Sequence, residues 1–239
     1  MATHGRGHGL KCIQKTAIRY GTKLRLLVIG GQAILAYCGR IRVTKDLDIV
    51  TPKKDQGLLL AILKECGFIV EGSSFGLRAV SYEEGEEYVI HASVGDILDE
   101  SRGHENPVVY TVPETTYGEG KTLALNGLLI EGEDGPPVAA VLPLPDLLLT
   151  KLLPIGRETD LEDVATLILE QSDQLAKTEV ASRLDERTAL TPIILERLEA
   201  LAMFVREREV GKVWLGERWT PRKREAVMNF IRELVSIVR

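Results

Sequence analysis

Apolar residues in the first part of the chain come in short runs, each stopped by glycine, proline or a charged residue. LRLLVIG at 24–30 is short and rich in branched apolar residues, which is typical of a buried strand. GQAILAYCG at 31–39 has apolar residues at helical spacing and ends on a glycine, so it predicts a helix. DLDIV at 46–50 alternates polar and apolar residues, which is the period of a strand. Together these segments predict a strand–helix–strand unit.

The other segments before residue 143 predict further helices and strands. A short helix is expected at 9–20 and a second at 54–68, where KDQGLLLAILKECGF again runs into a glycine near its end. The stretch 100–122 is rich in Gly, Pro, Thr and charged residues, which predicts a loop. Strands are expected at 77–84, 86–94, 122–132 and 137–143.

The pattern changes after Pro143, where four segments repeat apolar residues at the 3.6-residue period of amphipathic helices. These segments lie at 144–154, 160–171, 191–209 and 221–239. A boundary near residue 143 therefore divides the chain into an α/β core, residues 1–143, and a helical C-terminal domain, residues 144–239. We find no internal repeat and no low-complexity segment.

The composition predicts a folded cytoplasmic protein. The chain has 239 residues, 44% of them hydrophobic, which is enough to bury a sizeable core. No apolar run approaches the roughly 20 residues of a membrane helix, and the N-terminus MATHGRGHGLKC lacks the apolar centre of a signal peptide. Cys12, Cys38 and Cys66 are odd in number and have no CxxC spacing. We therefore expect reduced thiols, with no disulfide framework and no zinc site.

Charge is unevenly distributed. The formal net charge is −5, but nine Lys or Arg stand against five Glu from Arg206 to the end of the chain. This basic C-terminal part permits a contact with nucleic acid. A solvated helix surface explains the same charges, and both interpretations stay open.

The glycine pair and the aspartate pair carry the candidate chemistry. A strand followed by Gly30, Gly31 and a helix presents free backbone N–H groups and about half a positive charge, which suits a phosphate group. Asp46 and Asp48 lie two residues apart on a predicted strand, so their carboxylates share a face roughly 6.6–7 Å apart along it. Two such carboxylates repel each other unless a cation or a proton intervenes. Magnesium, held by one or two carboxylates and by substrate phosphates, is the cation that this pattern favours, although solvated acids on an exposed edge remain an alternative.

The order of these features resembles the nucleotidyltransferase superfamily typified by DNA polymerase β. The likeness rests on a Gly-Gly turn, a helix and then a strand bearing two aspartates, in the stretch LLVIGGQAILAYCGRIRVTKDLDIV. It is closest to the prokaryotic branch that includes the AbiEii-type toxins, in which the second half reads R-x-T-x-D-hydrophobic-D, here Arg42, Thr44, Asp46 and Asp48. A second stretch, LPDLLLTKLLPIGRETDLEDVATLI, resembles a segment that follows the core in that branch, with matching positions at Lys151, Arg157, Asp160 and Asp163.

The resemblance implies an α+β fold, with a nucleotidyltransferase-type mixed β-sheet core, flanking helices and a helical C-terminal part. Asp46 and Asp48 would ligate Mg²⁺ or Mn²⁺, and Lys151 would add positive charge toward a nucleoside triphosphate unless it is an ordinary surface lysine. Arg157 would pair with Asp160 or Asp163 and hold two helices in register. The positions implied to bind the nucleotide are Gly30, Gly31, Gln32, Arg42, Thr44 and Lys45.

One feature of the superfamily is missing. Its members carry a third carboxylate on a later strand, whereas the centre of the matching segment EEYVIHASV holds His91. Imidazole can accept a proton or bind a metal, so His91 is a catalytic candidate as well as a candidate structural histidine. Glu87 lies on the same face by the strand period and Asp96 follows the strand, so either could substitute. Gln32 stands where many members have serine.

Three functions follow from the resemblance. The first is Mg²⁺-dependent transfer of a nucleoside monophosphate from a nucleoside triphosphate to an acceptor hydroxyl. In a toxin-like protein the acceptor would be RNA, such as a tRNA end approached by the basic C-terminal helices, and an antitoxin would be the protein partner. The second is a non-catalytic nucleotide-binding or interaction module that has lost the third carboxylate. The third is an antibiotic-type nucleotidyltransferase with a small-molecule acceptor.

Overall fold

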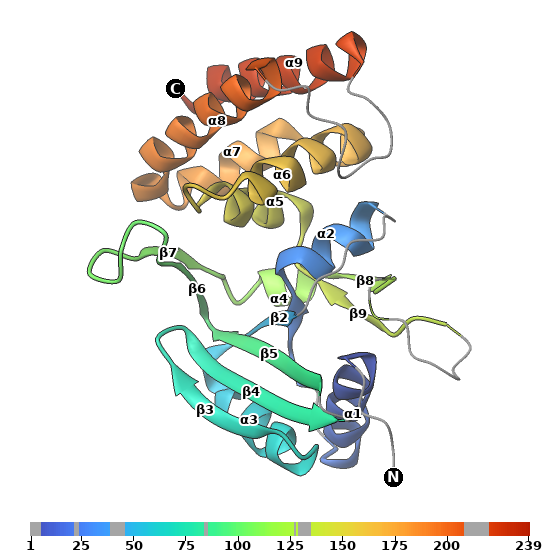
Figure 1. Ribbon diagram of the computed structural model, residues 1–239. Helices are drawn as coiled ribbons and strands as arrows, with labels where there is room; N and C mark the ends of the chain where they lie inside the picture. Colours follow the sequence, from blue (N-terminus) through green and yellow to red (C-terminus); the bar gives the residue numbers. More distant parts are fainter. Residues whose placement is uncertain are drawn as a thin grey trace. The chain divides into compact units, whose positions relative to one another are not determined.

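The computed structural model describes residues 6–21, 24–38, 46–83, 86–126, 128, 135–207 and 220–239. The chain forms two compact units (Figure 1). The first unit contains Met1–Leu98 and Val109–Pro143, and the second contains Asp99–Val108 and Leu144–Arg239. Within the described ranges no helix is long and apolar enough to cross a membrane.

The first unit is built on a mixed β-sheet, which confirms the α+β fold. Within the described residues the order of its strands is β3-β4-β5-β2-β1-β9-β8, and β6 and β7 pair beside β5. Strand β2 runs parallel to β5, and β1 runs parallel to β9, whereas β1–β2, β3–β4, β4–β5 and β8–β9 are antiparallel. The strands are β1 Leu27–Val28, β2 Asp46–Thr51, β3 Ile69–Ser73, β4 Gly76–Glu83, β5 Glu86–Val94, β6 Asp96–Asp99, β7 Val108–Thr111, β8 Lys121–Ala124 and β9 Val138–Val141.

Helices pack against one face of this sheet, where the apolar side chains of the strands lie. Leu47 of β2 and Ile90 of β5 are cross-strand partners on that face, and both are buried. Helix α1 approaches the same face so closely that a Cβ on Gly9 would lie 2.9 Å from the Phe68 ring and 3.7 Å from Ile90. The helices of this unit are α1 Arg6–Arg19, α2 Gly30–Cys38, α3 Gln56–Glu65 and the short α4 Thr116–Glu119.

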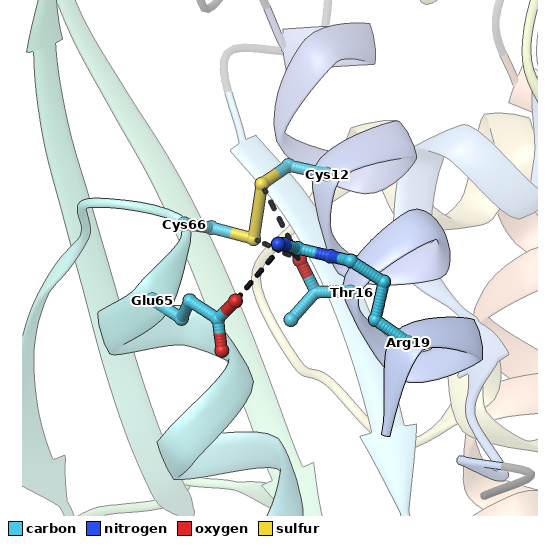
Figure 2. Close-up of a disulfide and its surroundings, with 5 residues drawn as sticks. All are labelled: Cys12, Thr16, Arg19, Glu65 and Cys66. Atoms are coloured by element: carbon cyan, nitrogen blue, oxygen red, sulfur yellow. Dashed lines mark hydrogen bonds and ion pairs between the residues drawn. A yellow bond between two sulfur atoms is a disulfide. The ribbon is translucent and has the colours of Figure 1, made fainter. Parts of the chain in front are cut away.

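A disulfide joins Cys12 of α1 to Cys66, the residue that ends α3, so the expectation of reduced thiols without a disulfide is wrong for this pair. Figure 2 shows the bond beside Thr16, whose hydroxyl lies 3.7 Å from Cys66 Sγ and 3.9 Å from Cys12 Sγ. Arg19 donates a hydrogen bond to Thr16 Oγ1 and forms an ion pair with Glu65 at 2.9 Å. The two cysteines are 54 residues apart in sequence, and only the packing of α1 on α3 brings them together.

The second unit is helical, as its amphipathic segments predict. Its longest helix starts at the N-cap Thr220, whose side chain accepts a hydrogen bond from the backbone N–H of Lys223 at 3.2 Å, and Pro221 follows at the first helical position. The helices are α5 Leu144–Leu152, α6 Glu158–Gln171, α7 Lys177–Asp185, α8 Thr191–Glu207 and α9 Pro221–Val238.

The expected loop at 100–122 is wrong in part, because strand β7 and helix α4 lie within it.

Candidate active site

The glycine turn lies directly after β1, at the start of α2. Strand β1 pairs with β2 in the register Val28↔Ile49, and the backbone N–H of Ile29 donates to the carbonyl of Asp48 at 2.9 Å. Gly30 has φ +64°, a left-handed conformation that residues with a Cβ rarely adopt. A Cβ on Gly30 would also lie 3.0 Å from Asp48 Cγ and would overlap the carboxylate. Glycine is therefore required at position 30 for two independent reasons.

The two aspartates point to one face of the sheet. In β2 the buried Leu47 and Ile49 alternate with Asp46 and Asp48, which are both half-buried. The face opposite to Leu47 thus carries both carboxylates, and Asp48 brings that face into contact with Gly30. The glycine turn and Asp48 thus meet in space, although residues 31–47 separate Gly30 from Asp48 in sequence.

His91 lies beside Asp48 in the neighbouring parallel strand. The register pairs Asp48 with His91, so their side chains leave the same face of the sheet. The next strand, β4, places Arg78 opposite His91. Nδ1 of His91 is buried, and no described residue forms a hydrogen bond with it, while the ring of Phe75 lies edge-on at 5.7 Å between centroids. His91 is therefore the titratable residue that the strand register places next to Asp48.

The other two candidates for the third acid have partners of their own. Glu87 forms an ion pair with Arg78 at 3.0 Å. Asp96 forms an ion pair with Lys53 at 2.8 Å. Burial raises the pKa of Asp96, but hydrogen bonds from Lys53 and Thr111 and the charge of Lys53 outweigh it, so its pKa is lower than usual. Both carboxylates are engaged by cations in this structure.

The first turn of α2 provides the candidate phosphate contacts. The backbone N–H groups of the first helical residues have no partner within the helix, and the helix start carries about half a positive charge. Gly31 is half-buried there and Gln32 is buried. Arg42, Thr44 and Lys45, which the resemblance also assigns to the nucleotide, lie outside the described residues.

The residues present fit a magnesium ion that shares its ligands with a substrate. Within the described residues, no group of three or more His, Cys, Asp or Glu could hold a metal ion by itself. Asp46 and Asp48 supply two oxygen ligands on one face, and the unpartnered Nδ1 of His91 lies on the next strand. Magnesium commonly binds one or two carboxylates and completes its shell with substrate phosphates and water. Asp46 and Asp48 would hold the ion in that way.

Lys151 belongs to the second unit and is not a surface lysine. Its side chain is buried on α5, and its Nζ lies 2.7 Å from Asp160 Oδ1 and 2.9 Å from Asp163 Oδ2, both on α6. Burial lowers the pKa of Lys151, but Asp163 and Asp160 outweigh burial and raise it. The Nε of Arg157 lies 3.2 Å from Asp160 Oδ2, without hydrogen-bond alignment and only three residues away in sequence. Lys151, rather than Arg157, therefore links α5 to α6.

Arg78 is the residue near this site that the sequence did not reveal. It lies in β4, in a row of cross-strand neighbours that runs from Asp48 through His91 to Arg78. Only the pairing register of the three strands indicates that Arg78 lies near this site. That register belongs to the folded sheet and cannot be inferred from local spacing in the sequence.

No protein-family model matches the chain, and no curated protein matches it. Solved structures with a similar fold include ANT(2'')-Ia in complex with adenylyl-2''-tobramycin, with 19% identity over 77% of this chain and 98% of that chain and a TM-score of 0.48. JHP933 from Helicobacter pylori is 14% identical over 96% of this chain and 89% of that chain, with a TM-score of 0.44. The lincosamide antibiotic adenylyltransferase LnuA, bound to lincomycin, is 17% identical over 66% of this chain and 94% of that chain, with a TM-score of 0.41. Each is a similarity of fold at low sequence identity.

Proposed function

We propose that the chain is a nucleotidyltransferase that transfers a nucleoside monophosphate from a nucleoside triphosphate to an acceptor hydroxyl, with a magnesium ion held by Asp46 and Asp48. The observation that carries this proposal is the contact between Asp48 and Gly30. A carboxylate pair for the metal and a helix start for the phosphates meet at one point, which is the arrangement that a metal-bound triphosphate needs.

The chain's own residues bind and orient the triphosphate. The amide groups at the start of α2 hold its phosphate oxygens, and Gly30 lets them approach the backbone. Magnesium, when bound, would neutralise negative charge on the phosphates and polarise the attacked α-phosphorus. In the transfer the acceptor oxygen forms a bond to the α-phosphorus, the bond from that phosphorus to the bridging oxygen breaks, and pyrophosphate leaves with the bonding electrons. His91, next to Asp48, takes the acceptor proton.

Incubation with a triphosphate labelled at the α-phosphorus tests the reaction. Bulk RNA, tRNA, amino sugars and other small alcohols are offered separately as acceptors, each with Mg²⁺ or Mn²⁺. We expect label in one acceptor class, and Asp48→Asn should reduce it to background because one metal ligand is lost. Asp173→Asn, an exposed aspartate of the second unit, is the matched control and should keep wild-type activity. Equal labelling by wild type and Asp48→Asn would reject the proposed site.

RNA is the acceptor that we favour in this panel. Arg222, Lys223 and Arg224 lie together in the first turn of α9. Three positive side chains on one helix turn form a basic cluster of the kind that binds the phosphate groups of RNA. Replacing all three by Gln should weaken tRNA binding and make the remaining binding less dependent on salt. Label in a small-molecule acceptor and none in tRNA would contradict the choice of RNA as the acceptor.

Nucleotide binding without transfer is a second candidate function, favoured by His91 at the position of the third carboxylate. Isothermal titration with a non-hydrolysable triphosphate and Mg²⁺ separates the two functions. Metal-dependent binding together with absence of label from every acceptor supports the binding module. Label in any acceptor that depends on Asp48 supports the enzyme.

A further inference from the structure

The second unit contains a buried arginine that forms no ion pair with any residue that the structure describes. Arg197 lies on the buried side of α8, between the core residues Ile194 and Leu198, and is only 6% exposed. Among the described residues, no acceptor forms a hydrogen bond with its Nε or its Nη2, although both atoms are enclosed. A buried ion without a partner is strongly destabilising, so a natural core rarely keeps one.

A second arginine binds the residue that precedes Arg197 in α8. Arg102, on the loop between β6 and β7, forms an ion pair with Glu196 through Nη2 at 3.0 Å. Its Nε is also enclosed, and no described residue accepts a hydrogen bond from it. Burial lowers the pKa of Arg197 from its usual value; Glu196 raises it, and the charge of Arg102 lowers it further. Three enclosed nitrogen atoms of the two guanidinium groups therefore have no acceptor among the described residues.

The nearby carboxylates are already engaged elsewhere. Asp99 accepts hydrogen bonds from the backbone N–H and the hydroxyl of Ser101, at 3.2 and 2.7 Å. Asp160 is bound through Oδ1 by Lys151 at 2.7 Å, and its Oδ2 lies 3.2 Å from Arg157 Nε without hydrogen-bond alignment. Glu196 is bound by Arg102. These carboxylates therefore affect Arg197 through their charge, but they accept no hydrogen bond from its Nε or Nη2.

We propose that Arg197 and Arg102 form a binding site for a phosphate-type oxyanion. Nε and Nη2 are the two donors on one edge of a guanidinium, and this edge matches two oxygens of a phosphate or sulfate group. The enclosed Nε of Arg102 supplies a third donor. Arg102 borders the site toward solvent, because a quarter of its side chain is exposed, so the anion enters next to it. The ligand is free phosphate or the phosphate group of a larger molecule.

Thermal unfolding of the full chain tests the site without metal ions. Inorganic phosphate and sulfate are compared with chloride at equal ionic strength. We expect either oxyanion to raise Tm by roughly 5 °C or more at a hundred times its Kd. Arg197→Met should lose this increment and keep or raise Tm in chloride, because the uncompensated charge is gone. Arg206→Met, an exposed arginine of the same helix, is the matched control and should keep the increment.

Titration calorimetry extends the test and distinguishes the sources of phosphate. Arg102→Gln should weaken phosphate binding at least tenfold, and this variant decides the question if Arg197→Met does not fold. A nucleoside monophosphate and a short oligoribonucleotide are titrated alongside inorganic phosphate, and the tightest of the three identifies the source. Any part of the increment that came from phosphate at the glycine turn of the first unit would be equal in wild type and Arg197→Met, so the difference between the two proteins measures the Arg197 site. An equal Tm increment in wild type and Arg197→Met, or none beyond that of chloride, would overturn the proposal.

Discussion

The carboxylate of Asp48 lies against the α-carbon of Gly30, so that no side chain fits between them. This contact ties the strand that carries the aspartates to the turn that starts α2. It makes the position of the carboxylate depend on the backbone of the glycine turn, because Gly30 is also held at φ +64°. The proposed metal ligand and the proposed phosphate-binding glycine turn therefore depend on each other for their positions.

Gly30→Ala should damage the site more than the fold. The left-handed backbone costs an alanine roughly 1–2 kcal/mol, and the new methyl group must displace the Asp48 carboxylate. A displacement of about 1 Å at a reacting centre can lower the rate about 100-fold. Initial rates of nucleotidyl transfer, together with Tm, measure the two effects.

Gly57→Ala is the matched control for that variant. Gly57 lies in α3, and a Cβ there would meet nothing within 4 Å. Alanine is the better helix former by roughly 0.5–1 kcal/mol, so Tm should stay equal or rise slightly and activity should not change. Unchanged transfer by Gly30→Ala would show that the contact with Asp48 has no part in the reaction.

His91 should be replaceable by aspartate but not by phenylalanine. His91→Asp restores a carboxylate next to Asp48 and should retain Mg²⁺-dependent transfer, whereas His91→Phe removes the proton acceptor and should lower the rate about 10²- to 10⁴-fold. His104→Phe, which changes an exposed histidine, is the control. Initial rates at saturating metal and triphosphate decide the point, and wild-type rates in His91→Phe would assign His91 a structural role.

Local periodicity was enough to predict the elements that position the aspartates. The alternation of DLDIV and the glycine that stops LRLLVIG are properties of adjacent residues, and β2 and the start of α2 follow from them. The sequence pattern does not predict strand β3, which reads IVEGS, or helix α7, which reads KTEVASRLD, because few of their residues are buried. Polar elements of this kind carry too weak a periodic signal.

Contacts between distant segments could not be predicted from the sequence in this way. The pairing of Asp48 with His91 depends on the register of two strands about 40 residues apart. The disulfide depends on how α1 packs on α3, and the association of Lys151 with Asp160 and Asp163 depends on how α5 packs on α6. In each case the tertiary arrangement brings together residues whose sequence spacing carries no signal for the contact.

Lys151→Met should destabilise the second unit by about 3 to 5 kcal/mol, because it leaves Asp160 and Asp163 buried without their cation. The pKa of Lys151 is raised above 10.5 in the folded chain. Its contribution to stability is therefore complete below pH 10.5 and is lost as the pH rises through the folded pKa. Denaturant unfolding from pH 7 to 11 should show a decline above pH 10.5 in wild type. Lys64→Met, at an exposed position, should show the same stability and decline as wild type.

The disulfide between Cys12 and Cys66 should add about 4 kcal/mol to stability, the loop-closure value for a bridge that spans 54 residues. A reductant should therefore lower Tm by roughly 10 °C in this chain. Cys12→Ser should have the Tm of the reduced wild type, and reductant should not lower it further, because Cys38 forms no disulfide. Alkylation of unfolded, unreduced protein followed by mass measurement checks the bond directly. One modified thiol indicates the disulfide, whereas three would show that α1 and α3 are held together by packing alone.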